Sequence, residues 1–240
     1  MSNTFYEYPP RESPQASKRI QESREAVFMS TVYAIMSVGV LNTAATAWLM
    51  GTNPAALEAL NDPLLGWVVL LVPFGIALIL PGRLRSMSPL WATFWFALFT
   101  SLLGVWLSGI AVQAMEDPAF AVDLAAAFLT TVGMFIGLAL YGWTTKRNLE
   151  GVGLFLGSAL WGLILGGIVN IYLQNDLMDF GLSAAGVVVF SGLIAADVQE
   201  GRRMARDGSF GASVLVALML YLDFINLLLH LLKLLGHKKD

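Results

Sequence analysis

The sequence predicts an all-α membrane protein folded as a bundle of seven transmembrane helices, and three observations lead to this fold class. Hydrophobic residues make up 57% of the 240 residues and charged residues only 13%, about half the charged fraction of an ordinary soluble domain. Seven stretches are apolar over about the 20 residues that a helix needs to cross a bilayer, or nearly so. The connections between them are short, so the spans must pack as one bundle.

The apolar stretches follow one another without leaving room for a soluble catalytic domain. They are Ala26–Met50, Leu64–Pro81, Leu90–Met115, Ala119–Trp143, Val152–Leu173, Leu182–Ala196 and a segment from about Ser213 to Leu235. Residues 1–25 are polar and charged without an apolar signal region, so we expect a flexible cytoplasmic tail there. The chain is thus divided into this tail, a seven-helix transmembrane domain over residues 26–236 and a short C-terminal tail over residues 237–240.

Lysine and arginine are distributed over the connections in a way that predicts the orientation. The N-terminal tail and every second loop are basic, through Arg11, Lys18, Arg19, Arg24, Arg83, Arg85, Lys146, Arg147, Arg202, Arg203 and Arg206. In the other three loops every charged residue is acidic: Glu58, Asp62, Glu116, Asp117, Asp176 and Asp179. Because basic loops stay in the cytoplasm, the N-terminus is expected to be cytoplasmic.

The end of the chain conflicts with this rule. Seven crossings place Lys233, Lys238 and Lys239 outside. Either the last segment is exported despite its charges, or one segment is re-entrant, the short sixth stretch being the candidate. Seven crossings are favoured, because a late tail obeys the rule less strictly than the early spans.

Asp223 is the most costly residue to bury, because it lies about ten residues into the last apolar stretch. A charged side chain at the centre of a membrane helix costs about 2.5–3.5 kcal/mol on insertion scales. Asn226 and His230 follow at positions i+3 and i+7, so the three side chains share one face of the helix. This polar stripe must face the bundle interior, where it is expected to line an ion path.

Asp197 ends the sixth stretch and has two interpretations. On its own it is a half-solvated boundary residue near Arg202. If the last two helices pack antiparallel, it instead approaches Asp223. Two neighbouring carboxylates cannot both ionise cheaply, so such a pair can share a proton, accept a cation or be latched by an arginine, and each of these responds to pH.

Three further charged residues remain open between an ordinary and a functional role. Asp123, near the start of the fourth stretch, either snorkels to the outer surface or adds a polar group to the path. Arg83 and Arg85 follow the second stretch at its cytoplasmic end, either as positive anchors or as counter-ions for Asp197.

Four segments give the chain a resemblance to a known family. They are "LYLDFINLLLHLLKLLG" (Leu220–Gly236), "GLIAADVQE" at the end of the sixth stretch, "GGIVNIYLQ" (Gly166–Gln174) and "TVYAIMSVGVLNTAATAW" in the first. Over about residues 28–236 the chain resembles a bacterial member of the transmembrane Bax inhibitor motif family, also described as the Bax inhibitor-1-like family. The segment of the last helix is the most specific of the four.

The resemblance implies a seven-helix bundle with the seventh helix at the centre and a pH-sensitive calcium leak through it. It implies that Asp197 and Asp223 form the sensor and bind calcium transiently, and that Arg83 or Arg85 is the latch. Some relatives carry an acidic residue in the second helix, which this sequence lacks. A bacterial inner membrane is the implied location.

Two alternatives to conduction remain. Some bacterial relatives modulate a membrane-anchored ATP-dependent protease, and the N-terminal tail is a possible handle. An enzyme is disfavoured, because Asp223 lacks the glycine-flanked context of intramembrane aspartyl proteases, and His230 and His237 are too few for a zinc site. Apart from lipid, calcium as the transported ion and this protease, no cofactor or partner is expected, and the net charge of −3 gives no reason to expect nucleic-acid binding.

Overall fold

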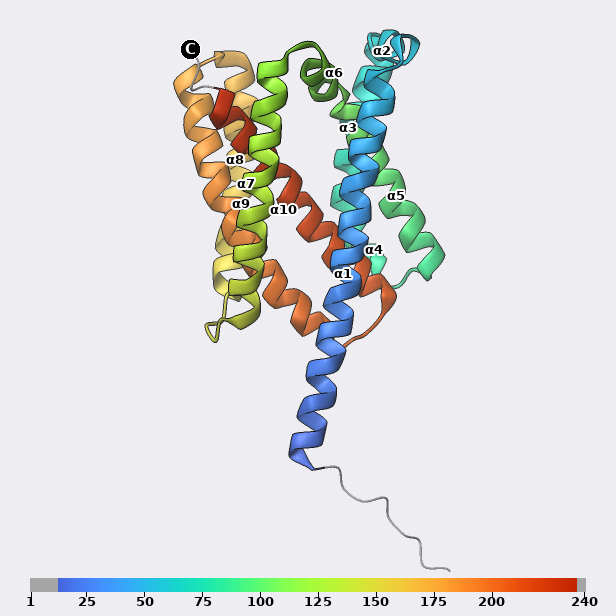
Figure 1. The fold of residues 1–240 in the computed structure, drawn as a ribbon, viewed down its shortest axis with the longest axis vertical. Coiled ribbons are helices and arrows are strands. Elements are labelled where there is room, and N and C mark those ends of the chain that lie inside the picture. The colour runs from blue at the N-terminus through green and yellow to red at the C-terminus, as the bar shows by residue number, and fades with distance from the viewer. Residues whose placement is uncertain (1–12, 237–240) are drawn as a thin grey trace, which may run out of the picture.

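The computed structural model describes residues 13–236, and every regular element in that range is an α-helix (Figure 1). The helices are α1 (Pro14–Gly51), α2 (Pro54–Leu60), α3 (Pro63–Ile79), α4 (Pro81–Leu84), α5 (Pro89–Trp106), α6 (Ser108–Glu116), α7 (Pro118–Thr144), α8 (Glu150–Leu173), α9 (Asp176–Met204) and α10 (Phe210–Gly236). The predicted all-α fold class is therefore confirmed.

Short polar signals set the helix boundaries. Proline occupies the first turn of α1 to α5 and of α7, where its missing N–H costs nothing. The side chains of Ser13, Asn53, Asp62, Asp117 and Asn175 each cap a helix by accepting a hydrogen bond from a backbone N–H. These caps keep the connections short, as a bundle requires.

Six of these helices are long and apolar enough to cross a membrane: α1, α5, α7, α8, α9 and α10. The pair α2 and α3, bent by 93° at their junction, supplies a seventh if it is counted as one span. With these helices packed together, the chain is a multi-pass membrane protein, and the expected bundle of seven segments is accounted for.

The last helix, α10, forms the centre of the bundle. It packs against α9, α1, α7, α5 and α4, and Figure 1 shows it running obliquely between the group α7, α8 and α9 and the group α1, α3 and α5. Its first nine residues after Phe210 are almost all buried, from Gly211 to Leu218 without interruption. The expectation of a central seventh helix is confirmed.

Two expected boundaries need correction. Helix α1 begins at Pro14, so residues 14–25 are helical and not a flexible tail, while residues 1–12 lie outside the described range. Ser13 caps this polar extension, and pairs one turn apart, such as Lys18 with Glu22 at 3.8 Å, lie along it. Hydropathy indicates where the lipid-embedded part of α1 begins, and the helix itself starts earlier in the sequence than that point.

The sixth stretch is also longer than expected. In place of Leu182–Ala196, α9 runs without interruption for 29 residues. A hydropathy profile detects only the middle of this helix, because both of its ends are polar. Asp176 and Asp179 lie at one end, and Arg202 and Arg203 lie at the other. The re-entrant alternative for this segment is therefore wrong.

The third stretch is broken in two. Helix α5 ends at Trp106, and α6 begins at Ser108. Leu107 separates the two with a backbone outside the helical region. The chain thus crosses with α5, and α6 covers the end of the bundle near α1 and α7.

The two ends of the bundle differ in charge. One end, here called the basic face, holds the start of α1, the short helix α4 with Arg83, and the loops that contain Arg85, Lys146, Arg147 and Arg206. The opposite end, the acidic face, holds α2, α6 and the turn between α8 and α9. Helix α10 ends at the acidic face (Figure 1). Its Lys233 forms an ion pair there with Asp179 at 2.9 Å.

Candidate functional site

Asp197 of α9 and Asp223 of α10 meet in the interior of the bundle. Their side chains are direct hydrogen-bond partners of each other. Asp223 is 5% exposed and Asp197 is half-buried. The antiparallel packing of α9 and α10 that the sequence left as a condition therefore brings the two acids together.

The chemistry of this contact follows from its geometry. Two ionised carboxylates at hydrogen-bonding distance inside a protein repel each other strongly, so ionising both at once is costly. The second carboxyl oxygen of Asp223, Oδ2, is buried and has no hydrogen-bond partner within the described residues. Glu200, one turn further along α9, adds its charge to the field at Asp197. The pair thus offers acceptor oxygens to a proton or a cation.

The surroundings of the pair are apolar and tightly packed. Tyr221 is fully buried beside Asp223 in sequence, and its hydroxyl lies 2.6 Å from that of Thr43, which donates to the carbonyl of Thr100 at 2.9 Å. Phe224 stacks edge-on against Phe135 of α7, with ring centroids 5.8 Å apart. These contacts fix the backbone of α10 on both sides of the acid.

The rest of the predicted polar stripe is divided between two environments. The Asn226 side-chain amide donates to the carbonyl of Leu222 in its own helix at 2.8 Å. The His230 ring stacks on Phe190 of α9, with centroids 5.6 Å apart, and fills the space that Gly186 leaves open. His230 Nδ1 is buried without a hydrogen-bond partner among residues 13–236.

The remaining candidates lie apart from the pair. Asp123 is half-buried near the start of α7. Arg83 and Arg85 are exposed at the basic face, where the short helix α4 packs on the start of α10. Neither guanidinium forms an ion pair within the described part of the chain, so no arginine latch on the acid pair is present in this conformation.

A charged cluster that sequence reasoning missed joins three helices at the basic face. Arg202 of α9 forms an ion pair with Glu25 of α1 at 2.9 Å. It also donates to the carbonyl of Trp143 in α7 and lies 4.4 Å over that residue's ring. Glu25 is only 12% exposed, which makes this a sheltered contact. Its three members lie at the ends of three predicted spans, and that is the only sequence signal for it.

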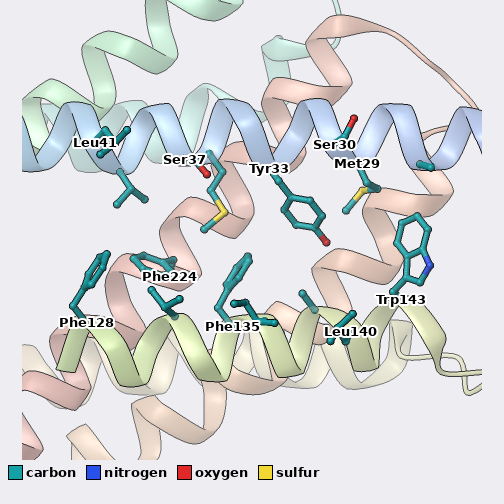
Figure 2. A pocket seen from close by; sticks show the side chains of 16 residues that line it. Met29, Ser30, Tyr33, Ser37, Leu41, Phe128, Phe135, Leu140, Trp143 and Phe224 are labelled. Atoms are coloured by element: carbon teal, nitrogen blue, oxygen red, sulfur yellow. The ribbon is translucent and has the colours of Figure 1, made fainter. Parts of the chain in front are cut away.

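An apolar groove runs between α1 and α7 from this cluster toward the opposite face. It has a volume of about 750 Å³, and Phe224 of α10 lies at its floor. Figure 2 shows Tyr33 of α1 and Phe135 of α7 reaching toward each other across it, with Trp143 at one end.

The described residues do not bring three or more His, Asp or Glu side chains together as a metal site. Calcium takes six to eight oxygen ligands in stable protein sites, more than the carboxyl groups of Asp197 and Asp223 supply.

Comparison with known proteins places the chain among bacterial membrane proteins. Residues 25–240 match the family described as "Inhibitor of apoptosis-promoting Bax1". The chain is 36% identical over 220 residues to "Inner membrane protein YbhL" of Escherichia coli strain K12, covering 88% of this chain and 92% of that protein. An uncharacterized protein of Borreliella burgdorferi is 32% identical over 231 residues, covering 92% and 97%. The protein YrjE of Lactococcus lactis is 36% identical over 217 residues, covering 87% and 90%.

Proposed function

We propose that this chain, which belongs to the family of inhibitors of apoptosis-promoting Bax1, is a pH-sensitive calcium leak channel. Asp197 and Asp223 are proposed to gate it. The observation that carries the proposal is the direct contact of two acids inside a membrane bundle. Ionisable residues in such a position are expensive and mark ion or proton pathways.

The closed state is the one in which the pair shares a proton. The shared proton joins the two carboxyl groups in one hydrogen bond and thereby holds α9 against α10. Rising pH removes that proton and leaves two negative charges side by side. Their repulsion separates the helices at this point, and a calcium ion passing down its gradient offsets the charge.

A latch on the closed state is assigned to Arg83, with Arg85 as the alternative. Both lie at the basic face, next to the start of α10, and both are exposed. An arginine of α4 reaches the acid pair only if α4 moves along α10. The latch therefore belongs to a conformation other than the one described above.

Calcium flux into proteoliposomes tests the sensor. The wild-type chain should admit more calcium as the pH rises from about 6 to about 8, and Asp223→Asn should lose this dependence because its pair has no proton to release. Asp197→Asn should behave like Asp223→Asn. Glu58→Gln, which removes an exposed acid in α2, is the matched control and should retain the wild-type profile. Equal pH-dependent flux from wild type and Asp223→Asn would contradict the proposal.

One feature favours a second function, that of a non-conducting modulator of a membrane-anchored ATP-dependent protease. The first turns of α1 are exposed and extend beyond the bundle (Figure 1), where a partner can reach them. Deleting residues 2–17 removes this extension but keeps Glu25. Loss of protease capture with unchanged calcium flux would support a modulator role beside conduction. Unchanged capture would argue against the extension as a handle.

The proposed location is a bacterial inner membrane with the basic face in the cytoplasm. The Escherichia coli relative carries "inner membrane protein" in its name, and the basic loops gather at one end of the bundle. Cysteines introduced at Arg147 and at Glu58 test the orientation, since a membrane-impermeant thiol reagent should label only the second from outside.

A further inference from the structure

We propose that the groove between α1 and α7 binds one acyl chain of an anionic phospholipid, with the lipid phosphate at the arginines of the basic face. This is independent of calcium conduction, because it concerns the flank of the bundle and not the contact of α9 with α10.

The shape of the groove fits a single flexible chain. Its lining on α1 runs from Ala26 to Leu41, which is about 22 Å of helix axis. One leaflet of a bilayer is about 15 Å of hydrocarbon, so the groove is long enough for an extended acyl chain. The rings of Tyr33 and Phe135 meet edge to face across it, with centroids 6.4 Å apart, which is a contact distance for an aromatic pair. A thin acyl chain can lie against these two rings, whereas a helix of a second copy, about 10 Å across, cannot pass between them.

The lining is predominantly apolar, with Ser30, Tyr33, Ser37 and Trp143 as its members that carry a polar group. The hydroxyl group of Ser30 donates to the carbonyl of Val27 in its own helix at 2.8 Å, so it offers no free donor to the groove. Leu41, Val132 and Ile136 contribute aliphatic surface. Such a surface inside the membrane is covered by lipid.

The charge is found at one end only. The apolar groove reaches Ala26 and Trp143, and a second, polar hollow of about 640 Å³ begins at the next residue, Glu25. Arg24 and Arg206 line this hollow. Both are exposed, and neither forms an ion pair within residues 13–236.

The charge at this end selects the headgroup. Arg202 is already neutralised by Glu25, so Arg24 and Arg206 supply the excess positive charge. That charge is complementary to a phosphate whose headgroup brings no compensating cation, as in phosphatidylglycerol.

Lipid binding to the purified, delipidated full-length chain tests the proposal, measured by native mass spectrometry. Phosphatidylglycerol should bind one molecule per chain more tightly than phosphatidylcholine with the same acyl chains. Ser37→Phe and Ile136→Trp place a ring in the groove from opposite walls. Each should weaken binding about tenfold, since displacing even two methylene groups has an effect of that size.

Matched variants lie one face away on the same helices. Val38→Phe and Leu129→Trp alter side chains that are 64% and 69% exposed and lie outside the groove, and both should bind like wild type. Arg206→Gln should weaken phosphatidylglycerol about fivefold and leave phosphatidylcholine unchanged. Arg147→Gln, an exposed arginine elsewhere on the basic face, should change neither. Circular dichroism identifies any variant that fails to fold. If one groove variant fails, lipid binding to the variant on the opposite wall of the groove tests the proposal.

Three results would overturn the proposal. Wild-type affinity in both groove variants would show that the acyl chain lies elsewhere. Equal binding of the two lipids, with no effect of Arg206→Gln, would remove the phosphate site. A dimer of the wild-type chain that Ser37→Phe dissociates, with lipid binding unchanged, would assign the groove to a second copy.

Discussion

Gly142 of α7 lies against the backbone of Ala195 in α9, so closely that a Cβ atom on Gly142 would overlap the Ala195 carbonyl oxygen. Small residues allow membrane helices to approach in this way. The contact fixes α7 to α9 only two residues before Asp197. It therefore fixes the backbone of α9 next to Asp197, one member of the acid pair.

Gly142→Ala should lower the stability of the bundle by about 1–3 kcal/mol, because the added methyl group forces two backbones apart. Thermal unfolding in detergent measures this as a fall in Tm. Gly137→Ala lies in the same helix with open space at its Cβ position and should leave Tm unchanged or slightly raised. A similar loss from both variants would mean that helix flexibility, and not close approach, explains the effect.

The stability of the wild-type chain should fall as pH rises, because deprotonation of the pair places two negative charges together in the interior. The sign follows from the bound proton, which the folded state holds more tightly than the unfolded state and must give up at high pH. Thermal unfolding from about pH 5 to about pH 9 should show this decline, and Asp223→Asn should flatten it. A decline of equal slope in the variant would assign the dependence to other groups.

Arg202→Ala should destabilise the bundle by about 2 kcal/mol, since it removes a sheltered ion pair and the stacking on Trp143 together. Arg202→Lys should not restore the loss, because an ammonium group cannot form both contacts. The neighbouring Arg203 is the control. Its partners Glu150 and Glu200 are 61% and 40% exposed, so Arg203→Ala should cost no more than about 0.5 kcal/mol. Chemical unfolding of the three variants in detergent compares these losses.

Tyr221→Phe should destabilise the bundle by about 1–2 kcal/mol through loss of the buried hydrogen bond to Thr43. Helix α1 and helix α10 are joined at this point, so the loss should appear in global unfolding. Tyr141→Phe alters a hydroxyl group on a side chain that is 48% exposed and should leave Tm at the wild-type value. Equal Tm values for all three proteins would show that Thr43 is satisfied by Thr100 alone.

The fold could be predicted from the sequence to the extent that lipid determines it. Apolar length gives the number of segments, and the cost of Asp223 in lipid requires that residue to face inward, where it lies. Hydropathy failed where helices leave the hydrocarbon, as at the polar ends of α9 and the polar start of α1. Caps and turn-to-turn pairs continue those helices, and they do not register as apolar.

The site was only partly accessible for a different reason. Asp197 and Asp223 lie on consecutive helices, so a short loop makes their meeting a natural expectation. Glu25 and Arg202 are 177 positions apart, and nothing local links them. The groove between α1 and α7 has no sequence signal either, since its lining is as apolar as the lipid-facing surface around it.

The central position of α10 has a consequence for biogenesis. Among the described helices α10 is synthesised last, yet it supplies the surface on which α1, α5, α7 and α9 pack. The earlier spans therefore cannot complete the bundle core until the 27 residues of this helix are in place. A nascent chain cut short at the loop after α9 thus leaves Asp197 inserted without its partner and the bundle without a core, a substrate for quality control.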